Sequence, residues 1–110
     1  MGLDASVTVE SADDEVVFRL AVRNDGEHPV ELTFRSGQTA EFVVTNDGEP
    51  VWRWSDERLF TQQVRTETLS PDSETTAVGH WTDPTVGEYT VEATLATTGE
   101  RVAAETVFRV

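Results

Sequence analysis

The side chains that could do catalytic chemistry in this chain are few and lie far apart in the sequence. Its two histidines are His28, beside a proline in a turn-like segment, and His80, beside a tryptophan. A nucleophilic serine or cysteine needs a neighbouring base and a third group that orients this base. Neither histidine neighbours a serine in a motif such as G-x-S-x-G. We therefore expect two surface histidines, no catalytic residue and a protein that is not an enzyme.

The ligand sets of common metal sites are also missing. A zinc site takes three or four His or Cys ligands, whereas the chain has two histidines and no cysteine. Acidic and amide residues do gather at Asp13–Asp14–Glu15 and at Asn46–Asp47. Neither group has the glycine and the bidentate glutamate of an EF-hand calcium loop. We expect solvated turns at both places, and neither a metal nor a cofactor.

The chemistry that the chain does offer is binding, in residues 52–62, WRWSDERLFTQ. Tryptophan and arginine are the residue types that dominate binding hot spots. Because side chains alternate along a strand, the two tryptophans share one face. They either pack over the core, with the indole N–H bonded to a partner, or form an exposed aromatic anchor; one buried and one half-exposed indole is a third possibility. The expected partner-binding residues are Trp52, Arg53, Trp54, Arg58, Leu59, Phe60 and Gln62.

The elements that must position these residues read as short β-strands. Apolar residues alternate with polar ones over most of the chain, and turn residues recur every eight to twelve positions. The segment TNDGEP, residues 45–50, predicts a tight hairpin, because positive φ angles cost little at Gly and are tolerated at Asn and Asp. Gly37, in the turn SGQT, is likewise expected to have a positive φ. The expected inward rows are Val16, Phe18, Leu20 and Val22; Val30, Leu32 and Phe34; Ala40, Phe42 and Val44; Tyr89, Val91, Ala93 and Leu95, paired with Val102, Ala104, Thr106 and Phe108.

Eight or nine short strands with one apolar face each must bury these faces against one another. The predicted fold is all-β, an immunoglobulin-like antiparallel β-sandwich with Greek-key connections, as a single domain over residues 1–110. Thr75, Ala77 and Gly79 lie on one strand face before Trp81, where small residues leave room for indoles from the facing sheet. Tyr89, after a glycine, suits the corner where a tyrosine hydroxyl braces a late strand.

Charge is the strongest global feature of the sequence. The chain carries 21 acidic and 8 basic residues, all of the latter arginine, for a net charge of −13. Because the acidic residues are spread over every segment, they indicate adaptation to molar salt, where repulsion between charges is screened beyond a Debye length of about 3 Å. The composition resembles that of proteins from salt-accumulating halophiles. Nucleic acid is excluded as a partner, because phosphate binding needs concentrated positive charge. With no signal peptide and no apolar run of membrane-spanning length, we expect a cytoplasmic protein that does not bind membranes. For the oligomeric state, we favour a monomer.

One long run carries more than a generic β pattern. Its segments LTFRSGQTAEF, VWRWS, FTQ and TLSPDSE, followed by Trp81 and GEYTVEATL, resemble the BsuPI-type intracellular proteinase inhibitor family. The resemblance covers roughly residues 20–95, and the combination of SGQ with W-x-W-S and F-x-Q is its specific part. It implies a β-sandwich that binds and inhibits an intracellular serine protease of subtilisin type.

The resemblance suggests a role for Leu59 and Phe60. Subtilisin-like proteases bind an extended segment by β-pairing and favour large apolar side chains, so either residue could fill the specificity pocket. Such a loop must be rigid to bind tightly, and without a disulfide its rigidity would depend on hydrogen bonds from Ser55, Gln62 or Gln38. Alternatively, Phe60 starts the next strand and points inward while Leu59 covers an edge.

Two other functions remain open at this stage. The chain could be a general immunoglobulin-like interaction or structural module that binds through a sheet edge or the tryptophan strand, without inhibiting a protease. A carbohydrate-binding sandwich would instead use Trp52 and Trp54 as a stacking platform, which requires exposed, coplanar indoles. The position and exposure of these two side chains therefore discriminate between the functions.

Overall fold

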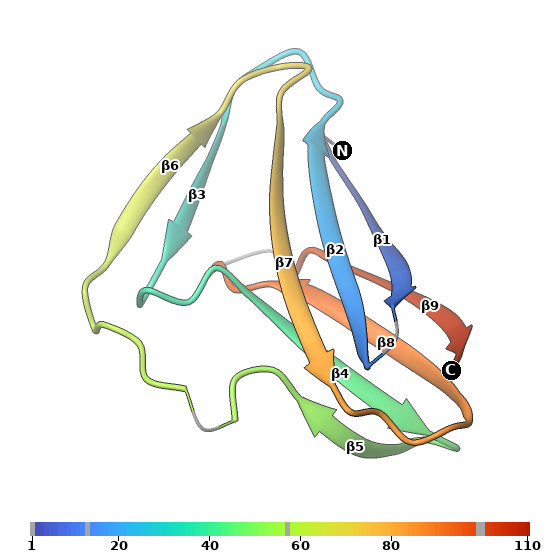
Figure 1. The fold of residues 1–110 in the computed structure, drawn as a ribbon. Coiled ribbons are helices and arrows are strands. Elements are labelled where there is room, and N and C mark those ends of the chain that lie inside the picture. The colour runs from blue at the N-terminus through green and yellow to red at the C-terminus, as the bar shows by residue number, and fades with distance from the viewer. Residues whose placement is uncertain (1, 13, 57, 99–100) are drawn as a thin grey trace.

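The computed structural model describes residues 2–12, 14–56, 58–98 and 101–110. In these residues the chain forms nine β-strands and no helix, so the all-β prediction is confirmed (Figure 1). None of the described residues belongs to a helix that is long and apolar enough to cross a membrane. The strands are β1 (Leu3–Ala12), β2 (Glu15–Asn24), β3 (Val30–Phe34), β4 (Ala40–Asn46), β5 (Glu49–Arg53), β6 (Arg65–Leu69), β7 (Glu74–Thr82), β8 (Glu88–Leu95) and β9 (Ala103–Arg109).

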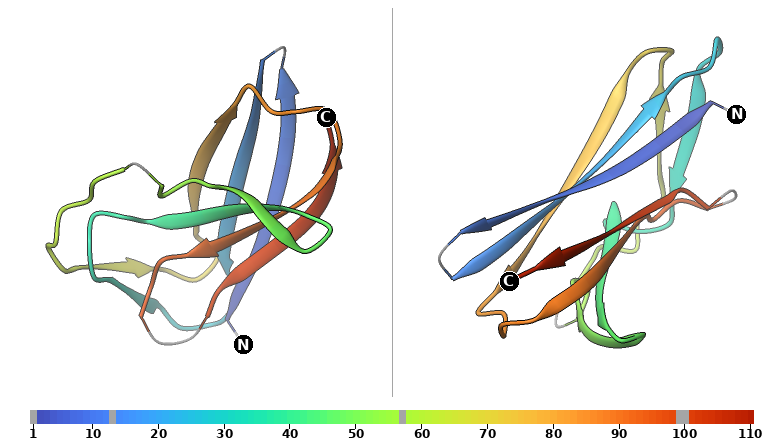
Figure 2. Two further views of the ribbon diagram at one scale, coloured as in Figure 1. Left: turned by 90° about the horizontal axis from the view of Figure 1, so that it is seen from below. Right: turned by 90° about the vertical axis from the view of Figure 1, so that its right-hand side faces the viewer.

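The strands form two facing layers with a separate two-stranded pair at one end. One sheet has the order β1-β2-β7 and the other the order β5-β4-β8-β9, while β3 pairs with β6. Every pairing is antiparallel. The strands of the two layers cross at a clear angle (Figures 1 and 2). In the order β1-β2-β7, the β7 strand lies at an edge of its sheet, with β2 as its neighbour on one side.

The core consists of the alternating apolar residues of both layers. From β2, the residues Val16, Phe18, Leu20 and Val22 are almost completely buried, as the period-two pattern predicts. They face Phe42, whose ring lies 6.0 Å from that of Phe18. The expected inward rows of β4 and β8 are buried as well: Ala40, Phe42 and Val44, and Tyr89, Val91, Ala93 and Leu95.

Two local turn predictions are confirmed. Asp47 and Gly48 have φ angles of 50° and 86° at the β4–β5 hairpin, where Asn46 pairs with Glu49. Both central residues thus have the positive φ of the turn that matches strand twist. Tyr89 is buried, and its hydroxyl donates a 2.7 Å hydrogen bond to the carbonyl of Thr85. The tyrosine hence braces the entry to β8.

Asn24, at the end of β2, is the one polar residue in the core of the described chain. Its Nδ2 donates to the carbonyls of His28 and Leu69, each at 2.9 Å, and its Oδ1 accepts from the Gly26 amide at 2.9 Å. The sequence marks this residue only as part of a turn. In the structure it ties the β2–β3 turn to the end of β6, which explains why a buried amide is tolerated.

Candidate functional site

Both tryptophans of the W-x-W segment pack over the core and are half-buried. Trp52, in β5, lies 5.9 Å from the ring of Phe18 and 6.0 Å from that of Trp81. Trp54 follows β5 directly, and its backbone N–H donates to the Phe42 carbonyl at 2.9 Å. The indoles thus contact the aromatic core and do not form the exposed platform that a carbohydrate site requires.

The Trp54 indole packs against one residue from each layer, Phe42 of β4 and Gly79 of β7. Its ring meets that of Phe42 edge-on at 6.4 Å. A Cβ on Gly79 of β7 would lie 3.1 Å from Trp54 Cδ1 and 2.8 Å from Phe42 Cδ2. These distances are too short for a methyl group, so the expected need for a small residue facing the indole is confirmed at Gly79.

The β5–β6 loop, comprising Ser55, Asp56 and residues 58–64 of the described chain, also contacts Trp54. The Arg58 guanidinium lies 4.4 Å from the centre of the indole, and Arg58 Nε donates to the Trp54 carbonyl at 2.7 Å. The Phe60 ring lies 5.6 Å from the indole, tilted by 38°. Two residues of the loop therefore rest on one aromatic side chain.

Leu59, between these two anchored residues, has an exposed fraction of 100%. Arg58 and Phe60 contact the Trp54 indole, whereas the side chain of Leu59 lies in solvent. The alternative for this segment is wrong in two respects: Phe60 does not start a strand, since β6 begins at Arg65, and Leu59 covers no edge. Phe60 packs on the Trp54 indole, but it is not among the partly buried apolar residues that pack against the core.

Hydrogen bonds fix the first end of the loop. Ser55 donates from both its backbone N–H, at 3.1 Å, and its hydroxyl to the carboxylate of Glu41 in β4. Arg53 lies 3.8 Å from the same carboxylate. Ser55 therefore makes hydrogen bonds of the kind that the rigidity of this loop would require. Glu41 carried no sequence signal, because an acid at an outward strand position is ordinary in so acidic a chain.

The SGQT turn fixes the second end of the loop. The Gly37 N–H donates to the Thr61 carbonyl at 2.9 Å. The expectation of a positive φ at Gly37 is wrong, because among the described glycines only Gly2 and Gly48 have one. The reason for glycine is instead close approach: a Cβ at Gly37 would lie 2.8 Å from Thr61 Oγ1.

Neither of the two glutamines expected to stiffen the loop makes a hydrogen bond to it among the described residues. Gln38 bonds within its own turn, where its Nε2 donates to the Ala40 carbonyl at 3.0 Å. Gln62 is exposed on the loop. The loop is therefore held by Ser55 at one end, Thr61 at the other and Trp54 beneath it.

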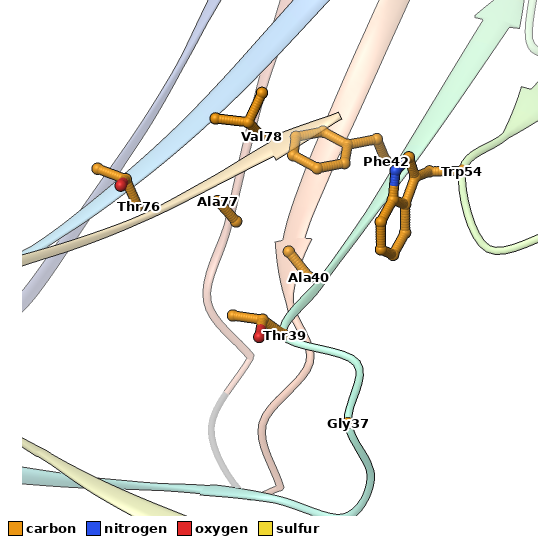
Figure 3. A pocket seen from close by; sticks show the side chains of 8 residues that line it. All are labelled: Gly37, Thr39, Ala40, Phe42, Trp54, Thr76, Ala77 and Val78. Carbon is orange, nitrogen blue, oxygen red and sulfur yellow. The ribbon is translucent and has the colours of Figure 1, made fainter. Parts of the chain in front are cut away.

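A groove runs beside Trp54, between β7 and β4. Its volume is about 250 Å³. Figure 3 shows the Trp54 indole and the Phe42 ring on one side and the β7 side chains on the other. The residues that line the groove are Gly37, Thr39, Ala40, Phe42, Trp54, Thr76, Ala77 and Val78.

The residues considered for catalysis and metal binding are scattered. His28 and His80 are both exposed, and His80 Nδ1 lies 3.3 Å from a carboxylate oxygen of Glu15. Asp14 is exposed in the β1–β2 turn, while Asp13 lies outside the described residues. Among the residues that the structure describes, no three potential ligands gather as a metal site would require.

Comparison with protein families gives one match. A family model described as BsuPI, intracellular proteinase inhibitor, matches residues 3–100. No curated protein matches the chain.

Several solved structures share the fold. A CARDB domain from Pyrococcus furiosus has 18% identity and a TM-score of 0.52, over 99% of this chain and 94% of that one. A penta-heme cytochrome c552 from Thermochromatium tepidum has 9% identity and a TM-score of 0.61, over 97% of this chain and 40% of that one. For a β-glucosidase from Kluyveromyces marxianus the identity is 13%, the TM-score 0.54, and the chain spans 14% of its length. Such low identities concern the fold alone, and the CARDB likeness confirms the immunoglobulin-like sandwich.

Proposed function

Because the chain belongs to the BsuPI family of intracellular proteinase inhibitors, whose model matches residues 3–100, we propose that it inhibits a serine protease of subtilisin type in the cytoplasm. The family consists of inhibitors and not of enzymes, so the partner that it implies is a protease. The proposed contact surface is the β5–β6 loop, with Leu59 as the side chain that enters the specificity pocket of the protease.

The exposure of Leu59 is the observation that carries this proposal. A leucine with an exposed fraction of 100% leaves its whole side chain available for burial. Burying a leucine side chain contributes about 1.5–3 kcal/mol. The ordering cost, about 0.5–1.5 kcal/mol for each side chain that binding immobilises, is lowered because the neighbours of Leu59 already rest on Trp54.

The other expected partner-binding residues have distinct parts in this proposal. Arg58 and Gln62 are exposed and flank Leu59, so they would contact the rim of the protease cleft. Phe60 and Trp54 form the support beneath the loop. Trp52 and Arg53 would not touch the protease but would support the loop. Trp52 packs on Trp81 in the core, and Arg53 pairs with Glu41, which also binds Ser55.

The test is an inhibition titration in molar potassium chloride, using an intracellular subtilisin-type protease from the same cell. Wild type should inhibit at stoichiometric amounts, while a Leu59→Ala, Phe60→Ala double variant with an unchanged melting temperature should not. Leu59→Ala alone removes three carbons at about 0.8 kcal/mol each, which corresponds to roughly a 50-fold weaker inhibition constant. Val86→Ala is the matched control, since Val86 is also highly exposed, at 84%, but belongs to the β7–β8 connection.

The outcomes separate the parts of the proposal. Equal inhibition by wild type and the double variant would keep the protease as partner and move the contact to another surface. No inhibition by wild type would refute the proposed function.

A second candidate function, strand pairing with a partner protein, is favoured by the free edge of β7. Residues 75–82 contain no Asp, Glu, Lys or Arg, although the chain has a net charge of −13. The opposite sheet protects its own β5 edge with Pro50 and a bulge, devices that hinder pairing. A dimer in sedimentation velocity that Val78→Lys dissociates would favour this candidate. A monomer whose inhibition survives Val78→Lys would count against it.

A further inference from the structure

The Leu59–Phe60 peptide bond is tied to the scaffold on both of its sides. On the N-terminal side, Arg58 Nε donates to the Trp54 carbonyl at 2.7 Å and the guanidinium covers the indole at 4.4 Å. On the C-terminal side, the Phe60 ring lies 5.6 Å from the same indole, and the Thr61 carbonyl accepts from Gly37 N–H at 2.9 Å. Each side would remain attached to the protein if this bond were cut.

The support for this attachment is itself well anchored. Trp54 donates its backbone N–H to Phe42 at 2.9 Å and packs against the Phe42 ring. The Arg58 N–H also donates to the Ser55 carbonyl, at 3.2 Å. Trp54 is thus a fixed platform in a chain with no cysteine, where no disulfide can hold the two sides together.

The chemistry of a serine protease gives this arrangement a consequence. The serine oxygen adds to the Leu59 carbonyl carbon, the bond from this carbon to the Phe60 nitrogen breaks, and the nitrogen takes the proton that the histidine removed from the serine. Hydrolysis is completed when water attacks the acyl-enzyme, which releases the Leu59 carboxylate and returns a proton to the serine. If the Phe60 amine stays in place, it attacks the acyl-enzyme first and restores the original bond.

We propose that Trp54 is a positioning residue that, through Arg58 and Phe60, makes the Leu59–Phe60 bond a slowly and reversibly cleaved site. Groups held in reacting position behave as if they were at very high concentration, so resealing competes with water. The inference rests on the proposed function, because it takes Leu59 as the residue that the protease binds. It adds that the chain is bound as a substrate and remains an inhibitor because its two cut ends do not separate.

The first test is the rate of cutting at this bond with a catalytic amount of the protease in molar potassium chloride. Mass spectrometry locates the cut and gives the fractions of intact and cut chain over time. Arg58→Ala should be cut between Leu59 and Phe60 about tenfold faster than wild type or more, the factor expected when a hydrogen bond from a charged donor is lost. Arg109→Ala is the matched control, since it also removes one exposed arginine, from β9, and should be cut like wild type.

The second test is the resealing reaction. Cut wild type, incubated with catalytic protease, should return to the same ratio of intact to cut chain that intact wild type reaches. Cut Arg58→Ala should remain cut. Phe60→Leu, which keeps an apolar side chain without the ring contact, should lie between the two. A purely structural role of Arg58 would change the melting temperature and leave this ratio unchanged.

These measurements distinguish the two proposals. Inhibition by wild type together with equal cutting of wild type and Arg58→Ala would overturn the positioning role and keep the proposed function. Absence of any cut in Arg58→Ala would overturn the positioning role as well. No inhibition by wild type would refute the proposed function, while faster cutting of Arg58→Ala by the same protease would still support the role of Trp54.

Discussion

Replacing Gly37 with alanine should weaken inhibition of the protease and leave the stability of the fold nearly unchanged. Gly37 lacks a positive φ, so alanine meets no backbone strain there. A Cβ would lie 2.8 Å from Thr61 Oγ1 and 3.3 Å from the Thr61 backbone nitrogen. The closer distance is roughly 0.7 Å short of a good contact at about 3.5 Å. The β5–β6 loop must therefore move away from the SGQT turn.

The expected size of the effect follows from the contacts that this movement breaks. Losing the 2.9 Å hydrogen bond from Gly37 N–H to the Thr61 carbonyl costs about 1 kcal/mol. A loop that must be ordered again on binding costs about 0.5–1.5 kcal/mol more. The sum corresponds to roughly a 10- to 70-fold larger inhibition constant. The free energy of unfolding changes less, because alanine lowers the entropy of the unfolded chain by about 0.4–1 kcal/mol and offsets the lost bond.

The assay compares the inhibition constants of Gly37→Ala, Thr61→Ala and the double variant in molar potassium chloride, with urea unfolding of each. Thr61→Ala removes the oxygen nearest to the new methyl group, so the double variant should inhibit better than Gly37→Ala alone. This gain is the coupling energy of two residues in contact. Inhibition by Gly37→Ala equal to that of wild type, or a double variant no better than Gly37→Ala, would refute the contact as the cause.

Four further predictions concern stability. Asn24→Ala should lower the free energy of unfolding in urea by about 2–4 kcal/mol, because the three hydrogen bonds of a fully buried amide side chain are lost. An unchanged urea midpoint would contradict this. Gly79→Ala should lower the free energy of unfolding by about 1–3 kcal/mol through overpacking against Phe42 and Trp54, and it should shift the tryptophan fluorescence. Unchanged fluorescence and stability would show that the two rings can move aside. Tyr89→Phe should cost about 1 kcal/mol, since the bond to Thr85 is lost, and an equal melting temperature would argue against the brace. The melting temperature of wild type should fall from molar potassium chloride to dilute buffer, because screening of the net charge of −13 weakens; a level melting temperature would refute salt adaptation as the reason for the acids.

Local patterns in the sequence were sufficient for the strands and the layers. Strands follow from side-chain alternation, since a strand buries every second residue, as in Val16, Phe18, Leu20 and Val22. The hairpin at Asp47–Gly48 follows from the backbone freedom of these two residue types. Both properties depend on neighbours within a few positions. The sequence therefore determined the strands and the sandwich, but it left open whether the indoles of Trp52 and Trp54 pack over the core.

Contacts between distant residues decided what that segment presents to a partner. Gly37 is needed because of Thr61, and Gly79 because of Phe42 and Trp54; no local pattern encodes either distance. The burial of Asn24 likewise depends on the Leu69 carbonyl, 45 positions away. Arg58 and Phe60 contact Trp54 while Leu59 between them is exposed, and these contacts depend on where the indole lies. The sequence offered a leucine and a phenylalanine side by side, and only the folded chain determined which of the two is fully exposed and which packs on Trp54.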